Sequence, residues 1–181
     1  MNTRTTLRRT VAALAVAGAA AGATALAAGT ANAMPTDFNC TSGQITTKLV
    51  YGGAGAGNRE GFLQFTAKPG ETCTLPASVP VDLVGAHDVL VNQQVPADAP
   101  AVQLTNGSSA YIPLHWTAID PSSQQQTPLA IDVTAPQETT PRGDQSDPEI
   151  TVPWSLGGVD TSAASHSVDV GAVTAGVAPA V

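Results

Sequence analysis

From residue 45 onward, apolar and polar residues alternate with a period of two, and this pattern limits the fold more than any other feature. The alternation is clearest in 45–51, 63–67, 79–83 and 110–116. Side chains of a β-strand point alternately to opposite faces, whereas the faces of a helix repeat every 3.6 residues. No window after residue 33 shows the helical period. The chain is therefore predicted to be all-β.

Five shorter apolar runs bring the number of candidate strands to about nine, with Pro, Gly, Ser and Asp clusters between them. These runs are 89–91, 102–105, 129–133, 150–154 and 168–170. Many short strands separated by turn signals are typical of two packed antiparallel sheets. We therefore predict an immunoglobulin-like antiparallel β-sandwich of about seven to nine strands. Asn106-Gly107 predicts a hairpin, because both residues tolerate positive φ.

The N-terminus has the three parts of an export signal in order. Arg4, Arg8 and Arg9 form a basic head, an Ala/Gly/Val/Leu run interrupted only by Thr24 covers 11–28, and Ala31-Asn32-Ala33 supplies small residues. This order predicts a signal peptide of residues 1–33, cleaved between Ala33 and Met34.

An uncleaved membrane anchor is the alternative, since the apolar run is about long enough to span a bilayer. Alanine and glycine contribute little to membrane insertion, however, and this favours cleavage. The signal is compatible with export by the general secretory route and by the twin-arginine route, and the residues do not choose between them. After cleavage we expect one β-sandwich domain over 34–170 and a frayed C-terminal tail over 171–181.

Removal of the signal leaves a strongly acidic chain. Its four cations, Lys48, Arg59, Lys68 and Arg142, stand against 14 carboxylates, so the net charge is −10. Nucleic-acid binding needs clustered lysine and arginine, and an anionic membrane surface would repel such a chain. We therefore expect neither nucleic acid nor membrane as a partner, and no cofactor.

Two cysteines, Cys40 and Cys73, are predicted to form a disulfide because an exported protein folds in an oxidising compartment. Closing a loop of this length stabilises a fold by roughly 3–4 kcal/mol in the chain-entropy estimate. A metal pair or reactive thiols are the alternative reading, but no histidines stand at matching spacing to complete a zinc site.

The glycine-rich stretch "YGGAGAGNREGFLQF", residues 51–65, raises the question of a phosphate-binding loop. A dinucleotide loop needs G-x-G-x-x-G between a strand and a helix, but Asn58 stands three residues after Gly55 and a strand follows. A Walker-type loop needs a Gly-Lys pair, which this stretch lacks. We predict that 52–61 is a loose connection between two strands.

The stretches "FTAKPGETCTLPASVPVDLV" and "VQLTNGSSAYIPLHW", after a cysteine that opens the domain, resemble the domain-of-unknown-function 4232 family of exported actinobacterial proteins. The matched motif positions are Thr66, Gly70, Cys73, Leu75, Pro80, Leu104, Gly107, Ser109 and Ala110. Ala67 and Ala77-Ser78 depart from the family pattern, and the second cysteine pair of many members is absent. The resemblance covers roughly residues 40–155. It implies a fold and export, and it offers no catalytic residues.

The three histidines, His87, His115 and His166, lie in different segments without the spacing of a metal site. Each is predicted to be a surface or strand-face histidine. His115 stands out, because it adjoins Trp116 and is expected on the strand face opposite the core residues. No G-x-S-x-G motif of a serine hydrolase occurs, and "NGSSAY" is interpreted as a turn entering a strand.

Asp144, Asp147 and Glu149 could offer oxygen atoms to calcium, but they lack the order of an EF-hand loop. An exposed acidic loop is the favoured reading, and calcium binding is left open. Arg142-Gly143-Asp144 matches an adhesion tripeptide that recurs by chance in polar loops. No metal site is therefore predicted.

These observations predict a secreted, non-enzymatic β-sandwich protein that acts in binding or structure at or beyond the cell surface. The partner would be an extracellular protein or a cell-wall component, and the chain is expected to be a monomer. Loops at the ends of a sandwich commonly carry contacts, which points to 85–88, 120–128 and 136–149. A secreted hydrolase with a dispersed site and a protease inhibitor are the alternatives.

Overall fold

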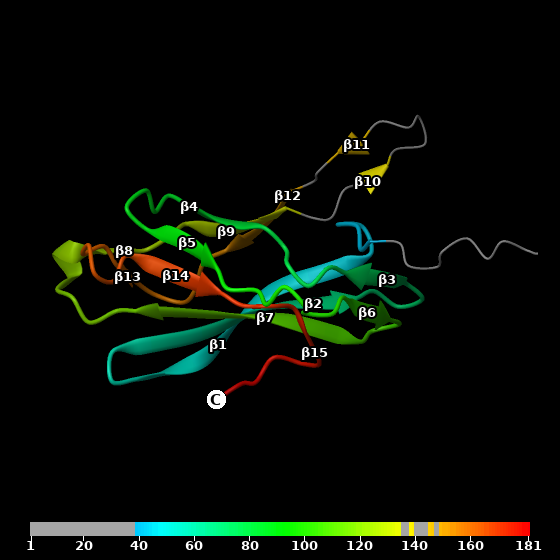
Figure 1. Cartoon of the computed structure of the whole chain (residues 1–181), viewed down its shortest axis with the longest axis horizontal. Coiled ribbons are helices and arrows are strands. Elements are labelled where there is room, and N and C mark those ends of the chain that lie inside the picture. Colours follow the sequence, from blue (N-terminus) through cyan, green and yellow to red (C-terminus); the bar gives the residue numbers. More distant parts are fainter. Residues whose placement is uncertain (1–38, 135–137, 140–144, 147–148) are drawn as a thin grey trace, which may run out of the picture. The chain divides into compact units, whose positions relative to one another are not determined.

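The computed structural model of the chain describes residues 39–134, 138–139, 145–146 and 149–181 (Figure 1). These residues belong to the compact unit 35–181. They form strands and one 3-10 turn, η1 (Ser122–Gln124), and none of their helical segments is long and apolar enough to cross a membrane. The predicted all-β sandwich is confirmed. The predicted signal peptide and its cleavage between Ala33 and Met34 lie outside the described residues.

The larger sheet has the strand order β1–β2–β7–β14–β5. Its strands are β1 (Ile45–Gly55), β2 (Asn58–Ala67), β7 (Ser109–Thr117), β14 (Ser167–Val170) and β5 (Leu90–Gln93), and β15 (Thr174–Ala175) also pairs with β7. Every pair is antiparallel except β14 with β5, which is parallel. The parallel pair places the first residues of β5 and β14 at the same end of the sheet.

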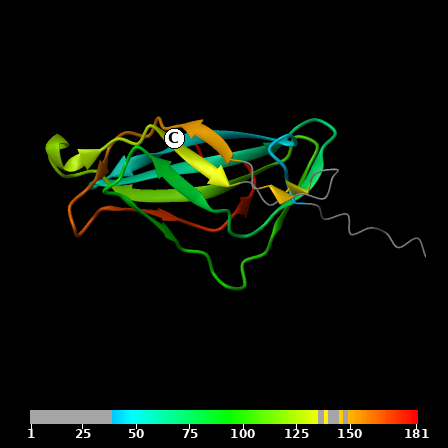
Figure 2. The ribbon, with the colours of Figure 1, turned by 90° about the horizontal axis from the view of Figure 1, so that it is seen from above.

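The smaller sheet has the order β12–β9–β4 and faces the larger one (Figures 1 and 2). Its strands are β12 (Glu149–Pro153), β9 (Ala130–Thr134) and β4 (Val81–Val84). Three short ladders complete the described strands. They pair β3 (Thr72–Leu75) with β6 (Val102–Thr105), β8 (Gln125–Gln126) with β13 (Val159–Asp160), and β10 (Glu138–Thr139) with β11 (Gln145–Ser146).

The core lies between the two sheets and follows the alternation seen in the sequence. On β7, Ala110, Ile112, Leu114 and Trp116 are fully buried or nearly so, whereas His115 is exposed. Trp116 stacks at a tilt on Trp154, with ring centroids 5.4 Å apart. The predicted orientation of this strand is therefore confirmed.

All nine candidate strands are present, but the described residues hold fifteen strands rather than seven to nine. Five of the additional strands are only two residues long, and such ladders are too short to show a period in the sequence. The sixth is β3, whose four residues include Cys73. The predicted disulfide between Cys40 and Cys73 is confirmed: the two Cα atoms are 4.7 Å apart and both residues are fully buried.

The glycine-rich segment differs from the prediction, because 52–61 is not a loose connection. β1 and β2 stay paired as far as Gly55 and Asn58, so only Ala56 and Gly57 form the turn. Both turn residues have positive φ, 49° and 87°, a conformation that matches the twist of the flanking strands. A register shift between Tyr51 and Gly53 marks a β-bulge on the first strand.

The Asn106-Gly107 turn forms with positive φ at both residues, but it does not join a hairpin as predicted. β6 pairs with β3, while β7 pairs with β2. The physical reason lies at Asn106, whose Oδ1 accepts a hydrogen bond from Gly70 N at 3.0 Å and whose N–H donates to Glu71 O at 2.8 Å. These bonds keep β6 beside β3.

The C-terminal segment 171–181 was predicted to fray, but the structure holds most of it against the larger sheet. Gly176 N donates to Ser109 O at 2.8 Å, and Ala178 N donates to Gln64 Oε1 at 3.0 Å. Gln64 is 5% exposed and Ala178 is 6% exposed. Since a buried amide oxygen needs a donor, the pairing with Gln64 explains why this segment stays in place.

The first prediction concerns the disulfide. Replacing both Cys40 and Cys73 by alanine is expected to lower the free energy of unfolding by roughly 3–4 kcal/mol, since the open chain regains loop entropy. Urea unfolding followed by tryptophan fluorescence measures the loss. A loss within experimental error of zero would contradict a structural role for the bridge.

The second prediction concerns the β1–β2 turn. Gly57→Ala is expected to lower the free energy of unfolding by at least about 1–2 kcal/mol, because φ is 87° and an added Cβ would collide with Ile119. Gly55→Ala is the matched control, since a Cβ there meets no atom within 4 Å. Equal melting temperatures for the two variants would show that the turn is as loose as the sequence suggested.

Candidate functional site

The loop that follows β7 is held at one end of the sandwich by a buried carboxylate. Asp160 is fully buried, and its carboxylate accepts hydrogen bonds from the backbone N–H groups of Ile119 and Asp120 at 3.0–3.1 Å. Gln125 Nε2 donates a further bond to Asp160 Oδ1 at 3.1 Å. One side chain therefore fixes both ends of the 119–125 segment.

Burial of Asp160 acts to raise its pKa, because desolvation penalises the charged form. The hydrogen bonds from Ile119, Asp120, Thr117 and Gln125 outweigh this effect, so the pKa lies below its ordinary value. The carboxylate therefore stays ionised at neutral pH, and its charge is matched by donors rather than by a cation.

Two of the three loops expected to carry contacts bind each other. Gln126 Nε2 donates to Asp88 Oδ2 at 2.6 Å, and Asp88 N donates to Gln126 Oε1 at 3.1 Å. This reciprocal pair joins 85–88 to 120–128. Most of the third segment, 136–149, lies outside the described residues, and with it Arg142, Asp144 and Asp147.

The 85–88 loop of this pair lines an open depression of about 430 Å³. Its lining residues are His87, Asp88, Leu90, Thr161, Ala163 and His166. The Nδ1 of His166 donates to Ser162 O at 3.2 Å, which leaves Nε2 as the ring nitrogen available to a ligand. We call this depression, with the 85–88 loop that lines it and the 120–128 loop that is hydrogen-bonded to Asp88, the end surface.

Sequence reasoning placed His87 and His166 in unrelated segments and missed that they line one depression. The parallel pairing of β5 with β14 brings them together, because His87 precedes one strand and His166 the other. Leu90 N donates to His166 O at 2.8 Å and fixes this register. A linear sequence carries no signal for which strands pair in parallel, so no pattern could have placed the two histidines in one depression.

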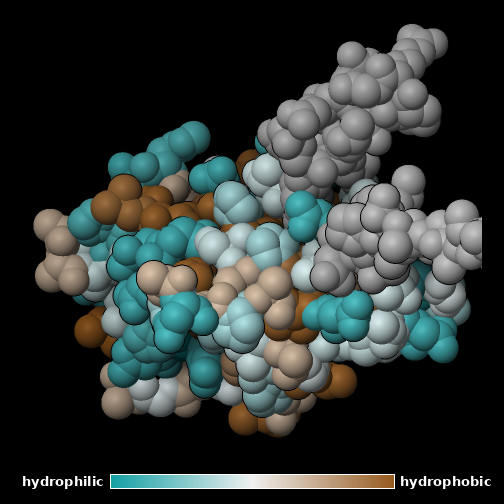
Figure 3. Space-filling view, turned by 45° about the vertical axis from the view of Figure 1, so that its right-hand side comes forward, coloured by the Kyte–Doolittle hydropathy of each residue, from teal (hydrophilic) through white to brown (hydrophobic). Residues whose placement is uncertain are grey.

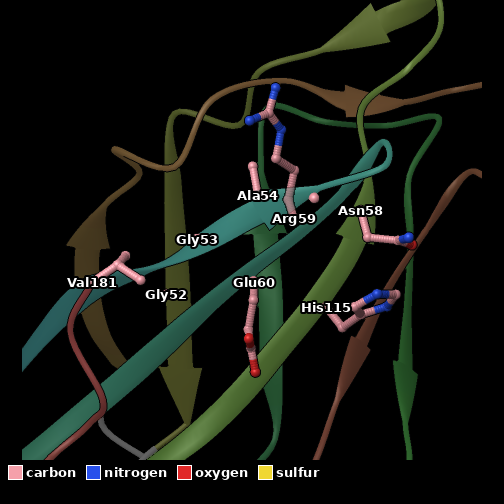
Figure 4. Close-up of a pocket in the computed structure, with 9 residues that line it drawn as sticks. Gly52, Gly53, Ala54, Asn58, Arg59, Glu60, His115 and Val181 are labelled. Carbon is pink, nitrogen blue, oxygen red and sulfur yellow. The ribbon is translucent and has the colours of Figure 1, made fainter.

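His115 lies elsewhere, on the outer face of the larger sheet. In the strand register it stands between Glu60 on β2 and Asp169 on β14. With Glu60 it lines a second depression of about 350 Å³, beside the glycines of β1 and Val181 (Figure 4). Figure 4 also shows Arg59 extending away from Glu60. The lining of this depression includes the polar side chains of Asn58, Arg59 and Glu60, and His115 is its single histidine.

Among the residues that the structure describes, no three His, Cys, Asp or Glu side chains gather closely enough to hold a metal ion. Glu149, the described member of the suggested calcium group, is an exposed residue of β12. The end surface therefore offers two imidazoles, a carboxylate that is already hydrogen-bonded, and an exposed leucine. Such a set can recognise a ligand by hydrogen bonds and apolar contact.

The residues that carried the family resemblance are structural. Cys73, Leu75, Leu104 and Ala110 are fully buried, while Gly70 and Gly107 have positive φ of 81° and 86°. The hydroxyl groups of Thr66 and Ser109 are hydrogen-bonded across the β2–β7 pair at 2.8 Å. None of these positions belongs to the end surface.

Asp160 gives a prediction about pH. Because its pKa is lowered in the folded state, its stabilising effect is complete above the unfolded pKa of about 3.9 and is lost as the pH falls through the folded pKa. Asp160→Asn is therefore expected to lower the free energy of unfolding by about 2 kcal/mol near neutral pH. The difference in the free energy of unfolding between Asp160→Asn and wild type should become smaller in acid.

Urea unfolding at a series of pH values measures this difference. Asp98→Asn, at an exposed loop position, is the matched control and should leave the profile unchanged. A gap between Asp160→Asn and wild type that is constant from neutral pH to acid would contradict the assignment of the ionised carboxylate as the anchor.

Comparison with known proteins adds the family. A family model described as a domain of unknown function, DUF4232, matches residues 40–176. The match extends beyond the 40–155 expected from the motifs and includes β14 and β15, which complete the larger sheet. The searches of curated proteins and of solved structures find no match. With its motif residues at core and turn positions and the match over most of its length, the chain belongs to the DUF4232 family.

Proposed function

We propose that this chain is a secreted, non-enzymatic β-sandwich protein that binds an extracellular protein or a cell-wall component through the end surface. One observation carries the proposal: two loops and two histidines from distant segments converge at one end of the sandwich. Loops presented by a rigid sandwich are the usual place for recognition.

The proposal of secretion rests on two features. The N-terminal residues have the order of an export signal, and Cys40 and Cys73 form a buried disulfide of the kind that persists in oxidising compartments. The net charge of −10 after cleavage argues for a partner other than nucleic acid or an anionic membrane.

Surface hydropathy supports a polar mode of recognition. Figure 3 shows one face of the molecule, on which hydrophobic residues form small groups among hydrophilic ones. Large exposed apolar patches are typical of hydrophobic interfaces. At the end surface, Leu90 is 57% exposed beside the histidines and can add a single apolar contact.

The test is a pull-down from cell-wall fractions and culture supernatant on immobilised residues 34–181. The double variant His87→Ala, His166→Ala is expected to reduce capture of the bound component by roughly tenfold or more, since a few central residues carry most binding energy. His115→Ala is the matched control, because this exposed histidine lies on the sheet face outside the end surface. Capture that survives the double variant, or no specific capture, would contradict the proposal.

A secreted hydrolase is the second candidate, because His87, His166 and Asp88 line the same depression. An imidazole could act as a general base toward water. Asp88 Oδ2, however, accepts a hydrogen bond from Gln126, which ties this carboxylate to the neighbouring loop. Turnover of a panel of ester and glycoside substrates that His166→Ala abolishes would favour the hydrolase over the binding protein.

A further inference from the structure

Strand β1 forms a long edge of the larger sheet whose outer side carries no backbone hydrogen bond, and Cα atoms of β12 in the facing sheet come within 8 Å of part of it. It has eleven residues and pairs only with β2, and no other backbone group of the described residues is hydrogen-bonded to it. The other free edges of the two main sheets are shorter, with four residues in β5, four in β4 and five in β12. An unpaired edge of this length presents a ready template for another strand.

The ladder shows which backbone groups of β1 are free. Lys68 N donates to Gln44 O toward β1, whereas Ala67 N donates to Ser108 O toward β7. In an antiparallel sheet, the backbone groups of successive residues point alternately to the neighbouring strand on one side and on the other. The N–H and C=O groups of Thr47, Leu49 and Tyr51 therefore point away from β2, toward the free side.

The described charges are unevenly divided along the chain. Lys48, Arg59 and Lys68, the described cations, all lie between residues 45 and 68, where Glu60 is the single carboxylate. Nine carboxylates and no lysine or arginine are found among the other described side chains. Lys48 is exposed on β1 itself. Among the described residues, the free edge thus belongs to the one segment of net positive charge, and Lys48 is the cation that lies on the edge strand.

We propose that the free edge of β1 binds an extended acidic segment of a partner protein as an added strand. Main-chain hydrogen bonds to Thr47, Leu49 and Tyr51 would supply affinity, and carboxylates near Lys48 would supply selectivity. A second copy of β1 complements the edge less well, because it brings another Lys48 to it. This edge uses none of the residues that line the end surface, so the proposal does not depend on that function.

The probe is a ten-residue peptide of alternating valine and glutamate, with capped ends, added to the ¹⁵N-labelled protein isolated after export with its disulfide intact. We expect shifts of the Thr47, Leu49 and Tyr51 amide signals and slower hydrogen exchange at these three groups. A peptide of alternating valine and lysine is expected to bind at least roughly tenfold more weakly, because rim charges set selectivity. Added salt should narrow this difference.

Thr47→Pro tests the backbone contribution, since proline removes an outward N–H and is tolerated at an edge position of this kind. It is expected to abolish peptide binding with little change in melting temperature. Thr151→Pro is the matched control on the free edge of β12. The N–H of Trp154 donates to Leu129 O toward β9, and the direction of the N–H groups alternates along the strand, so the N–H of Thr151 points away from β9. Pro153, two residues further on, already stands at an outward-facing position of the same strand.

Lys48→Glu tests the charge and should reverse the order of the two peptides. Three results would overturn the proposal: no binding of the acidic peptide by wild type, equal binding by Thr47→Pro, or equal affinity for the acidic and basic peptides. If the wild-type protein dimerises and Thr47→Pro abolishes the dimer, the edge binds a second copy of the chain. That result would likewise overturn the proposal of an acidic partner segment. If Thr47→Pro fails to fold, the amide shifts of the wild-type protein and the reversed peptide preference of Lys48→Glu still test the proposal.

Discussion

The two-sided pairing of β7 is the constraint on which the rest of the sandwich depends. This strand forms nine register pairs with β2 on one side and pairs with β14 and β15 on the other. Its inward residues, from Ala110 to Trp116, are the centre of the core. Because β7 fixes β14, and β14 fixes the parallel strand β5, the position of the end surface follows from one buried strand.

At the end surface, polar interactions hold the loops together with apolar burial, since Ala86 of the 85–88 loop is 3% exposed and belongs to the core. The carboxylate of Asp160 binds the backbone of 119–120, and Gln126 binds Asp88 in both directions. Charge-assisted bonds in a buried setting are stronger than neutral ones and specify geometry. The loops can therefore be positioned accurately while their outer side chains remain free to contact a ligand.

The family motif and the candidate binding surfaces occupy different residues. Motif positions such as Cys73, Leu104 and Gly107 are buried or have a turn conformation, so they define the fold. The end surface and the edge of β1 lie outside these positions. Their charges also differ, since the described cations lie in 45–68 and Asp88 belongs to the acidic remainder. We expect the two surfaces to attract partners of different chemistry.

The period-two pattern determined the class of fold, nine strands and the orientation of β7, and two cysteines after a predicted export signal were enough to predict the disulfide. These features are local or follow from composition, so a sequence can carry them. The tertiary structure alone decided which strands pair. It separated β6 from β7 after a correctly predicted turn, held the C-terminal segment on Gln64, and placed His87 and His166 in one depression through a parallel pair. Strand partners depend on contacts between residues far apart in the chain, and the alternation along a single strand does not specify them.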